Sequence, residues 1–250
     1  RRHTRFKCDW SSDVCSSDLF FDAMFHAGSR LKYVGARHEQ GAGYMAFGYA
    51  RSTGRVGTYA VVPGPGVLNT TAALSSAYAV NAPVLCLTGQ IPSWAIGRGI
   101  GMLHEIPDQL AMLQGLTRWA ARIDTVAQAP TLVNAAFARL NSGRRGPHAL
   151  EMACDVMAGS GEATLLPSAT ALANPAVDTD AVERAVQLLR SAERPMIFVG
   201  SGAADASQEV RELAERLDAP VVCFRGGQGV LDARHPLFQS LPGGHQLWHT

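Results

Sequence analysis

Five short apolar runs recur along the chain, at intervals that leave room for a helix between them. They lie at residues 58–62, 84–88, 148–152, 196–199 and 221–224. Continuously apolar runs are typical of strands that are buried on both faces of a parallel sheet. Segments between or beside these runs carry apolar residues at helical spacing, over 130–140, 179–190 and 206–217. The alternation predicts an α/β fold built on a doubly wound parallel sheet.

Composition and charge restrict the classes of protein to which the chain can belong. Of its 250 residues 47% are hydrophobic and 17% are charged, which is typical of a globular protein rather than a disordered one. The net charge of +1 gives no support for nucleic-acid binding or for a membrane-surface role. No apolar run approaches the ~18 residues that a membrane span needs. The five scattered cysteines indicate no disulfide framework and favour a reducing, cytoplasmic environment.

Two breaks in composition predict the domain organisation. Residues 1–19 combine a basic start, two Ser-Ser-Asp repeats and no periodicity, and we interpret them as a foreign segment that has replaced the native N-terminus. Residues 158–175 are rich in Gly, Ser, Thr and Pro and are typical of a linker. Two α/β units are therefore expected, at 20–157 and 176–250, and the second is short for a whole domain.

The stretch Arg37-His-Glu-Gln-Gly41 stands out because it places an acid at the start of a helix. An apolar run at 31–34 precedes it and predicts a strand, and a run of small and apolar residues at 41–50 predicts a closely packed helix. Glu39 would then lie at the edge of the sheet where ligands bind in α/β proteins. The alternative is that Glu39 only complements the positive end of the helix dipole.

Two glycine-rich turns follow predicted strands. The first, Pro63-Gly-Pro-Gly66, joins the strand at 58–62 to a helix expected over 67–80. It lacks the Lys-Ser/Thr pair of a nucleotide P-loop and is equally compatible with a tight turn. The second, Gly200-Ser-Gly-Ala-Ala-Asp205, begins like a dinucleotide fingerprint but carries Asp at the position of the third glycine.

Four stretches in this order and spacing resemble the thiamine-diphosphate-dependent enzymes of the acetolactate (acetohydroxyacid) synthase-like group. They are Arg37–Gly41 with Gly48-Tyr-Ala-Arg51, Pro63-Gly-Pro-Gly-Val-Leu-Asn69, Pro83-Val-Leu-Cys-Leu-Thr-Gly-Gln90 and Gly146-Pro-His-Ala-Leu-Glu151. The resemblance implies a pyrimidine-binding domain at 20–157 and an incomplete central domain at 176–250. It also implies that the C-terminal domain, which grips the diphosphate through magnesium in this group, is absent.

The same resemblance implies roles for individual residues. Glu39 would be the catalytic acid that hydrogen-bonds the cofactor's aminopyrimidine, and a dry pocket would raise its pKa. Pro63, Gly64, Gly66, Asn69 and Gln90 would contribute to cofactor binding. His104 would face the substrate, where the synthases usually carry Gln. This difference favours another 2-oxo acid or acyl acceptor over that of acetolactate synthesis.

These implications give the expected function and its alternatives. The resemblance implies decarboxylation of a 2-oxo acid, followed by release of the aldehyde or its joining to a second carbonyl. It also implies Mg²⁺ with ligands outside this chain, FAD or ADP in the central domain, and a homodimer or homotetramer that uses the helices at 41–51 and 67–80. Alternatives are an acyl-CoA decarboxylase or aldehyde lyase of the same fold, or a non-catalytic nucleotide-binding module. On its own the chain is expected to be inactive.

Overall fold

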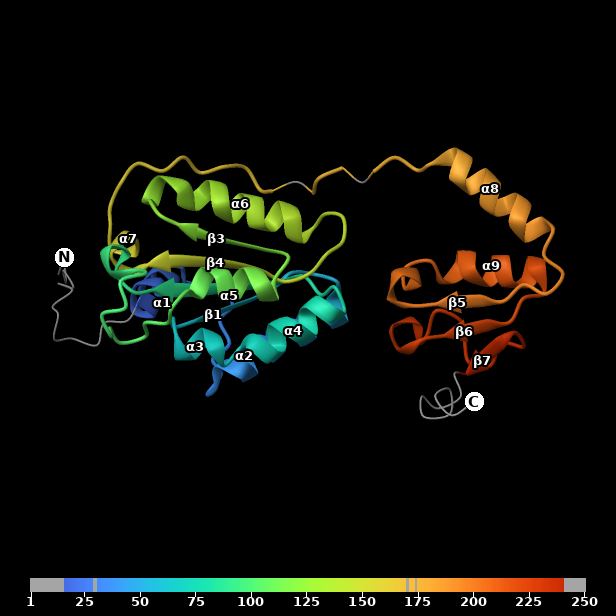
Figure 1. Cartoon of the computed structure of the whole chain (residues 1–250), viewed down its shortest axis with the longest axis horizontal. Coiled ribbons are helices and arrows are strands. Elements are labelled where there is room, and N and C mark those ends of the chain that lie inside the picture. Colours follow the sequence, from blue (N-terminus) through green and yellow to red (C-terminus); the bar gives the residue numbers. More distant parts are fainter. Residues whose placement is uncertain (1–15, 29–30, 170, 174, 241–250) are drawn as a thin grey trace. The chain divides into compact units, whose positions relative to one another are not determined.

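The structure, a computed structural model, describes residues 16–28, 31–169, 171–173 and 175–240 (Figure 1). The chain divides into two compact units, one that ends at residue 174 and one that begins at Pro175.

The first unit is built on a four-stranded parallel sheet. Its strands are β1 Gly57–Val61, β2 Val84–Gln90, β3 Trp119–Ile123 and β4 His148–Ala153, in the order β1-β2-β4-β3. Its helices are α1 Ser16–Ala27, α2 Glu39–Thr53, α3 Pro65–Leu68, α4 Thr71–Ala79, α5 Gln109–Leu116, α6 Ala129–Leu140 and α7 Cys154–Met157, with short 3₁₀ turns η2 Ser93–Ala95 and η3 Val126–Gln128. All three strand pairings are parallel, which confirms the predicted α/β fold class.

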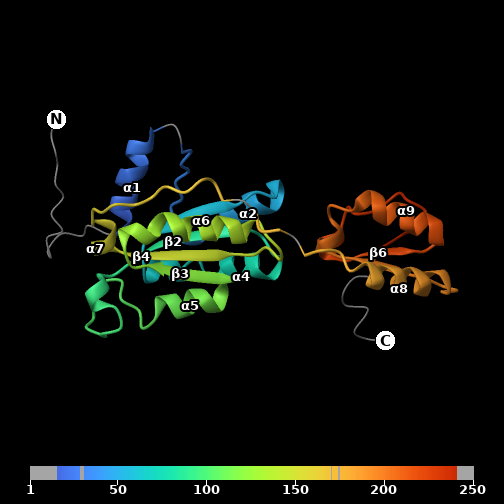
Figure 2. The same ribbon diagram turned by 90° about the horizontal axis from the view of Figure 1, so that it is seen from above.

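Helices cover both faces of this sheet. On one face, Tyr59, Cys86 and Ala149 form a row across neighbouring strands and pack beneath α2, α4 and α5. On the other face, Leu85 and Leu150 pack against α6. Figures 1 and 2 show α5 and α6 on opposite sides of β3 and β4. The next row toward the carboxyl ends of the strands, on the α5 face, holds Thr88, Glu151 and Arg122.

Glycines allow helix α2 to lie unusually close to its neighbours. A Cβ atom at Gly57 of β1 would overlap the backbone carbonyl of Ala46 in α2. A Cβ at Gly43 of α2 would come within 2.9 Å of the Ala73 side chain on α4. The small residues of this region therefore set the height of α2 above the sheet.

The structure corrects two expectations about local structure and reveals two further strands. Residues 31–34 form no strand, and the side chains of Leu31, Tyr33 and Val34 are exposed. An apolar run becomes a strand only when a neighbour supplies backbone partners, and among the described residues β1 pairs with β2 alone. The single helix expected over 67–80 is two helices, α3 and α4. Strands β3 and β7 were not predicted.

The second unit contains a three-stranded parallel sheet. Its elements are α8 Thr179–Arg190, β5 Ile197–Val199, η4 Ser201–Ala203, α9 Ser207–Leu217, β6 Val221–Cys223, η5 Arg225–Gly227 and β7 Phe238–Ser240. The strand order is β5-β6-β7, and Val210 and Ala214 of α9 pack on Val199, Val221 and Cys223. The apolar stripe of α8 is less buried, since Val182 and Val186 are both exposed.

Other predictions concern the ends of the chain and its environment. Residues 1–15 of the predicted foreign segment lie outside the described residues, and residues 16–19 belong to the start of α1. Within the described part of the chain, no helix is long and apolar enough to cross a membrane. Among the described residues, Cys86, Cys154 and Cys223 form no disulfide bond.

Candidate active site

Glu39 is the first residue of α2, and its side chain is partly buried. The imidazole Nδ1 of His38 caps the helix by accepting a hydrogen bond from the backbone N–H of Gln40, at 3.2 Å. The carboxylate Oε2 of Glu39 accepts a hydrogen bond from the amide Nδ2 of Asn69, at 3.1 Å. Asn69 is the C-cap residue that follows α3. Two predicted site residues, thirty positions apart, are thus in direct contact.

The electrostatics of Glu39 differ from the expectation. A hydrogen bond from its own backbone N–H and one from Asn69 lower its pKa below the ordinary value, and they outweigh the opposing effect of burial. The predicted raised pKa is therefore wrong for the chain as the structure describes it, because donors to the charged form dominate over desolvation. The proximity of His38 acts in the same direction.

The Pro63–Gly66 turn lies beside Glu39, and neither of its glycines has room for a Cβ unless neighbouring atoms shift. Gly64 has a positive φ of 59°, and a Cβ there would overlap the backbone carbonyl of His104. A Cβ at Gly66 would overlap the side chain of Val62 and would lie 3.9 Å from the Cγ of Glu39. Pro63 and both glycines are buried. The turn therefore packs between Glu39 and the loop that carries His104.

Gln90 lies at the end of β2 and is buried, but its amide takes part in a different group of contacts. Its Oε1 accepts a hydrogen bond from the N–H of Ile91, at 2.8 Å, and its Nε2 lies 3.4 Å from Glu151. Glu151 is fully buried and accepts hydrogen bonds from Gln109, at 2.8 Å, and from Arg122, at 2.6 Å. We assigned no role to Glu151, Gln109 or Arg122 from the sequence.

One signal for this buried group was present in the sequence. Glu151 is a charged residue within the apolar run 148–152, and a buried acid requires a partner. The partners themselves had no local signal, because they come from another strand and from the start of a helix.

His104 lies on the loop between η2 and α5. Its backbone has a positive φ of 69° and packs against Gly64. Its neighbour Glu105 folds back to accept a hydrogen bond from the backbone N–H of Met102, at 2.8 Å. This loop and the Pro63–Gly66 turn are therefore adjacent, and the structure brings His104 next to the turn through its main chain.

In the second unit, the Gly200–Asp205 turn follows β5 and meets the turn after β6. A Cβ at Gly227 would overlap the carbonyl of Val199, and one at Gly226 would come within 3.0 Å of the Ser201 side chain. Gly200 and Gly202 have open space where a Cβ would stand. The glycines after β6 thus serve close packing of the two turns.

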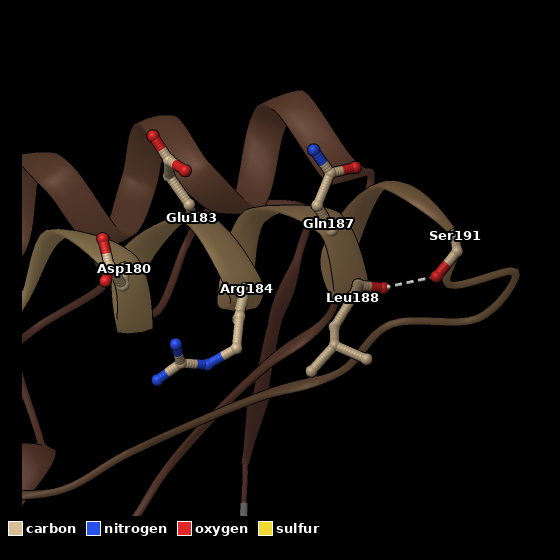
Figure 3. A pocket seen from close by; sticks show the side chains of 6 residues that line it. All are labelled: Asp180, Glu183, Arg184, Gln187, Leu188 and Ser191. Carbon is tan, nitrogen blue, oxygen red and sulfur yellow. Dashed lines mark hydrogen bonds between the residues drawn. The ribbon is translucent and has the colours of Figure 1, made fainter.

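A surface hollow lies along α8 and contains none of the predicted site residues (Figure 3). It is lined by Asp180, Glu183, Arg184, Gln187, Leu188 and Ser191. Figure 3 shows these side chains pointing in different directions from one helix, with the Ser191 hydroxyl donating to the carbonyl of Leu188, at 3.0 Å. Residues of a single helix cannot enclose a ligand, so this hollow does not qualify as an active site.

The residues present fit one end of the implied cofactor. Glu39 offers a carboxylate, which can accept from or share a proton with a ring nitrogen, and its oxygen lies beside an amide donor. For the diphosphate end, the described residues contain no cluster of three or more His, Cys, Asp or Glu that would hold a metal ion.

Comparison with known proteins identifies the family. The N-terminal TPP binding domain of thiamine pyrophosphate enzymes matches residues 16–112, and the central domain of the same enzymes matches residues 182–248. Together the two matches cover more than half of the chain. The chain therefore belongs to the thiamine pyrophosphate enzyme family.

Individual relatives are similar over most of this chain. A probable 2-ketoarginine decarboxylase from Pseudomonas aeruginosa is 36% identical over 84% of the chain and 38% of its own length. The mitochondrial acetolactate synthase catalytic subunit of Saccharomyces cerevisiae is 32% identical, over 90% of the chain and 34% of its own length. Acetolactate synthase isozyme 1 large subunit of Escherichia coli is 30% identical, over 92% and 40%. The chain thus spans about two fifths or less of these relatives.

A solved structure agrees with this fold. The X-ray structure of a candidate thiamin diphosphate-dependent enzyme from Mycobacterium smegmatis superposes with a TM-score of 0.76, at 22% identity, over 90% of this chain and 43% of that one. The fold of this chain is therefore that of a thiamine-diphosphate enzyme, with a pyrimidine-binding domain and part of a central domain.

Proposed function

We propose that this chain supplies the pyrimidine-binding half of the active site of an enzyme that decarboxylates a 2-oxo acid and releases the aldehyde or transfers it to a second carbonyl. The observation that carries the proposal is the contact between Glu39 and Asn69, next to the Pro63–Gly66 turn. It places a carboxylate at the start of a helix, beside the predicted cofactor-binding loop.

The residues of this chain would orient and protonate rather than perform the carbanion chemistry. When bound, thiamine diphosphate supplies a thiazolium carbon that loses a proton and then stabilises negative charge. Glu39 would hold a proton against the aminopyrimidine ring nitrogen, and Asn69 would fix the direction of the carboxylate. Exclusion of water from this carboxylate would oppose the hydrogen bonds that lower its pKa.

The relatives support a 2-oxo acid as substrate but not a single product. One is described as a decarboxylase and others as acetolactate synthases. His104 stands where the synthases usually have Gln, so we propose a substrate other than that of acetolactate synthesis. An acyl-CoA decarboxylase or an aldehyde lyase is the alternative, and analysis of the products formed from pyruvate, longer 2-oxo acids and acyl-CoA esters distinguishes them.

Exposed aromatic residues on α2 and α4 are suited to a contact between subunits. Exposed Tyr44, Met45 and Tyr49 on α2, together with Tyr78 on α4, support a surface for a second copy of the chain. We propose a homodimer or homotetramer, Mg²⁺ held by a third domain outside this chain, FAD or ADP as an optional ligand of the central domain, and a cytoplasmic location.

The central experiment uses the complete gene product that contains this sequence. Glu39→Gln should slow exchange of the thiazolium proton by at least about a hundredfold, as removal of a general acid–base group typically does. Glu162→Gln is the matched control, because Glu162 is exposed in the segment after α7. Near-normal proton exchange in Glu39→Gln would overturn the mechanism. Absence of thiamine dependence, with NAD or ADP binding lost on substitution of Gly200, would favour a nucleotide-binding module.

A further inference from the structure

A buried charge lies under the α5 face of the first sheet, at Glu151. Its side chain has no exposed surface, and the preceding row on the same face of the sheet, Tyr59, Cys86 and Ala149, belongs to the apolar core. Burying a carboxylate is costly unless it is paired and hydrogen-bonded. Arg122, opposite it on β3, donates from Nε to Oε1 at 2.6 Å. The second oxygen, Oε2, accepts from Gln109 at 2.8 Å.

Gln109 uses every part of its amide. Its Nε2 donates to Glu151 and to the backbone carbonyl of Gly89, at 2.8 and 2.9 Å, and its Oε1 accepts from the backbone N–H of Gly64, at 2.9 Å. Turning the amide over would set two donors against each other at Gly64 and two acceptors against each other at Glu151 and Gly89. The buried carboxylate therefore fixes which end of the Gln109 amide faces Gly64.

Gly64 connects the Gln109 amide to the segment that carries Asn69. Its N–H is held by Gln109, and its Cα packs against the main chain of His104. From Gly64 the backbone enters α3, where the N–H of Leu68 bonds to Gly64 O and that of Asn69 to Pro65 O, both at 3.0 Å. One short helical turn thus joins the held glycine to the amide that contacts Glu39.

We propose that Gln109 is a positioning residue, which holds the 64–69 segment by its hydrogen bond to Gly64 and so places the Asn69 amide against Glu39, with Glu151 and Arg122 as its buried anchor. The consequence for catalysis rests on the function proposed above. The positional claim does not, because every contact in it lies within this chain and involves no cofactor.

The test uses the 250-residue chain with ¹³C-labelled glutamate carboxyls and ¹⁵N-labelled amides. Gln109→Leu removes all three hydrogen bonds and keeps a side chain of similar size. It should accelerate hydrogen exchange of the Gly64 amide by about tenfold relative to the β2 amides. It should also raise the pKa of Glu39 toward the ordinary value, measured by NMR titration and assigned by the signal missing in Glu39→Gln.

The matched control is Thr117→Val, at the other end of α5. It deletes a buried hydrogen bond of similar length, from the Thr117 hydroxyl to the carbonyl of Leu113 at 2.8 Å. The control should destabilise the fold without changing the exchange of Gly64 relative to β2 or the titration of Glu39. Equal changes in the control and in Gln109→Leu would reduce Gln109 to a general structural role and overturn the proposal.

A double-mutant cycle tests the route through Asn69. In an Asn69→Ala background, Gln109→Leu should no longer change the titration of Glu39, because the amide that it positions is gone. An undiminished effect in that background contradicts the proposal. If Gln109→Leu does not fold, Gln109→Met replaces it in the test. Failure of both variants to fold also contradicts the proposal, because the contacts of Gln109 would then be needed for folding of the whole domain. If the complete enzyme requires no thiamine diphosphate, the proposed function is contradicted. The positional results on Gln109, Gly64 and Asn69 would be unaffected.

Discussion

The amide of Asn69 and the carboxylate of Glu39 lie 3.1 Å apart, although thirty residues separate them in the chain. They come from the end of α3 and the start of α2, and each stands at a helix terminus. The contact requires that both termini approach the same edge of the sheet, and the glycines of the Pro63–Gly66 turn permit that approach. Substitution of these glycines should therefore alter the position of the Glu39 carboxylate relative to Asn69.

Alanine at position 64 should destabilise the first unit. Gly64 combines a φ of 59° with a backbone neighbour, His104, where a Cβ would stand, so Gly64→Ala should cost about 1–3 kcal/mol in the free energy of unfolding. The control is Gly48→Ala, in the middle of α2 with open space around it, which should stabilise the chain by about 0.5–1 kcal/mol. Urea titration of both variants measures the contrast. Equal effects would show that the turn is not constrained as described.

Arg122→Met should be costly because it leaves Glu151 buried without its cation. The expected loss is about 2–4 kcal/mol, slightly less than for a fully buried pair because part of Arg122 is exposed. Adding Glu151→Leu should recover part of that loss, and a double-mutant cycle should give a coupling of about 1–3 kcal/mol. The exposed pair Arg211 and Glu215, at 3.0 Å, is the control and should show no resolvable coupling. Strict additivity at Arg122 and Glu151 would refute the pairing.

The contact between Ser93 and Asp155 should stabilise the fold at pH values above the ordinary pKa of an aspartate. This stabilisation should be lost in acid. Burial opposes ionisation of Asp155, but the hydroxyl and N–H of Ser93, at 2.6 and 2.9 Å, lower its pKa overall. A depressed pKa gives stability that is present above the unfolded value of about 3.9 and is lost as pH falls through the folded value. Asp155→Asn should therefore be less stable than the parent at pH 7, and the difference should shrink as pH falls below about 3.9, in urea titrations at each pH. A constant difference across that range would contradict the assignment.

His148 should make the first unit sensitive to mild acid. Burial, with help from Arg139 and Arg118, lowers its pKa, so the folded state favours the neutral ring, whose Nδ1 donates to Gly146 O at 3.1 Å. The unfolded chain then binds the proton more tightly, and stability is complete above the unfolded value of about 6.5 and declines as pH falls below it. Thermal melts between pH 8 and pH 5 should show a steeper decline for the parent than for His148→Phe. Parallel profiles would exclude this contribution.

The apolar runs predicted most of the sheet because a strand buried on both faces needs little beyond continuous apolar side chains. Strand β3 was not predicted because Arg122 interrupts its apolar run. The charge is tolerated because Arg122 pairs with Glu151 on β4, a strand that follows later in the chain. The opposite error occurred at 31–34, where an apolar run finds no strand partner. In both cases the deciding interaction is distant in sequence.

The candidate site shows the same division. Glu39, the Pro63–Gly66 turn and Asn69 were predicted together through the family resemblance, and the structure brings them together. The direction of the Glu39 pKa was wrong, because it depends on which donors surround the carboxylate. Gln109 could not be singled out from the sequence, since a glutamine at the start of a helix has no distinctive pattern until Glu151 and Gly64 are seen on either side of it.

The contact between Gly57 and the main chain of Ala46 has a consequence for how this protein tolerates substitution. Residue 57 carries no reactive group, yet any larger residue there would push α2 outward and carry its first residue, Glu39, away from Asn69. In a library with all twenty residues at position 57, only clones with glycine should therefore be functional. Position 57 should accept as few residue types as position 39, where Glu39 lies.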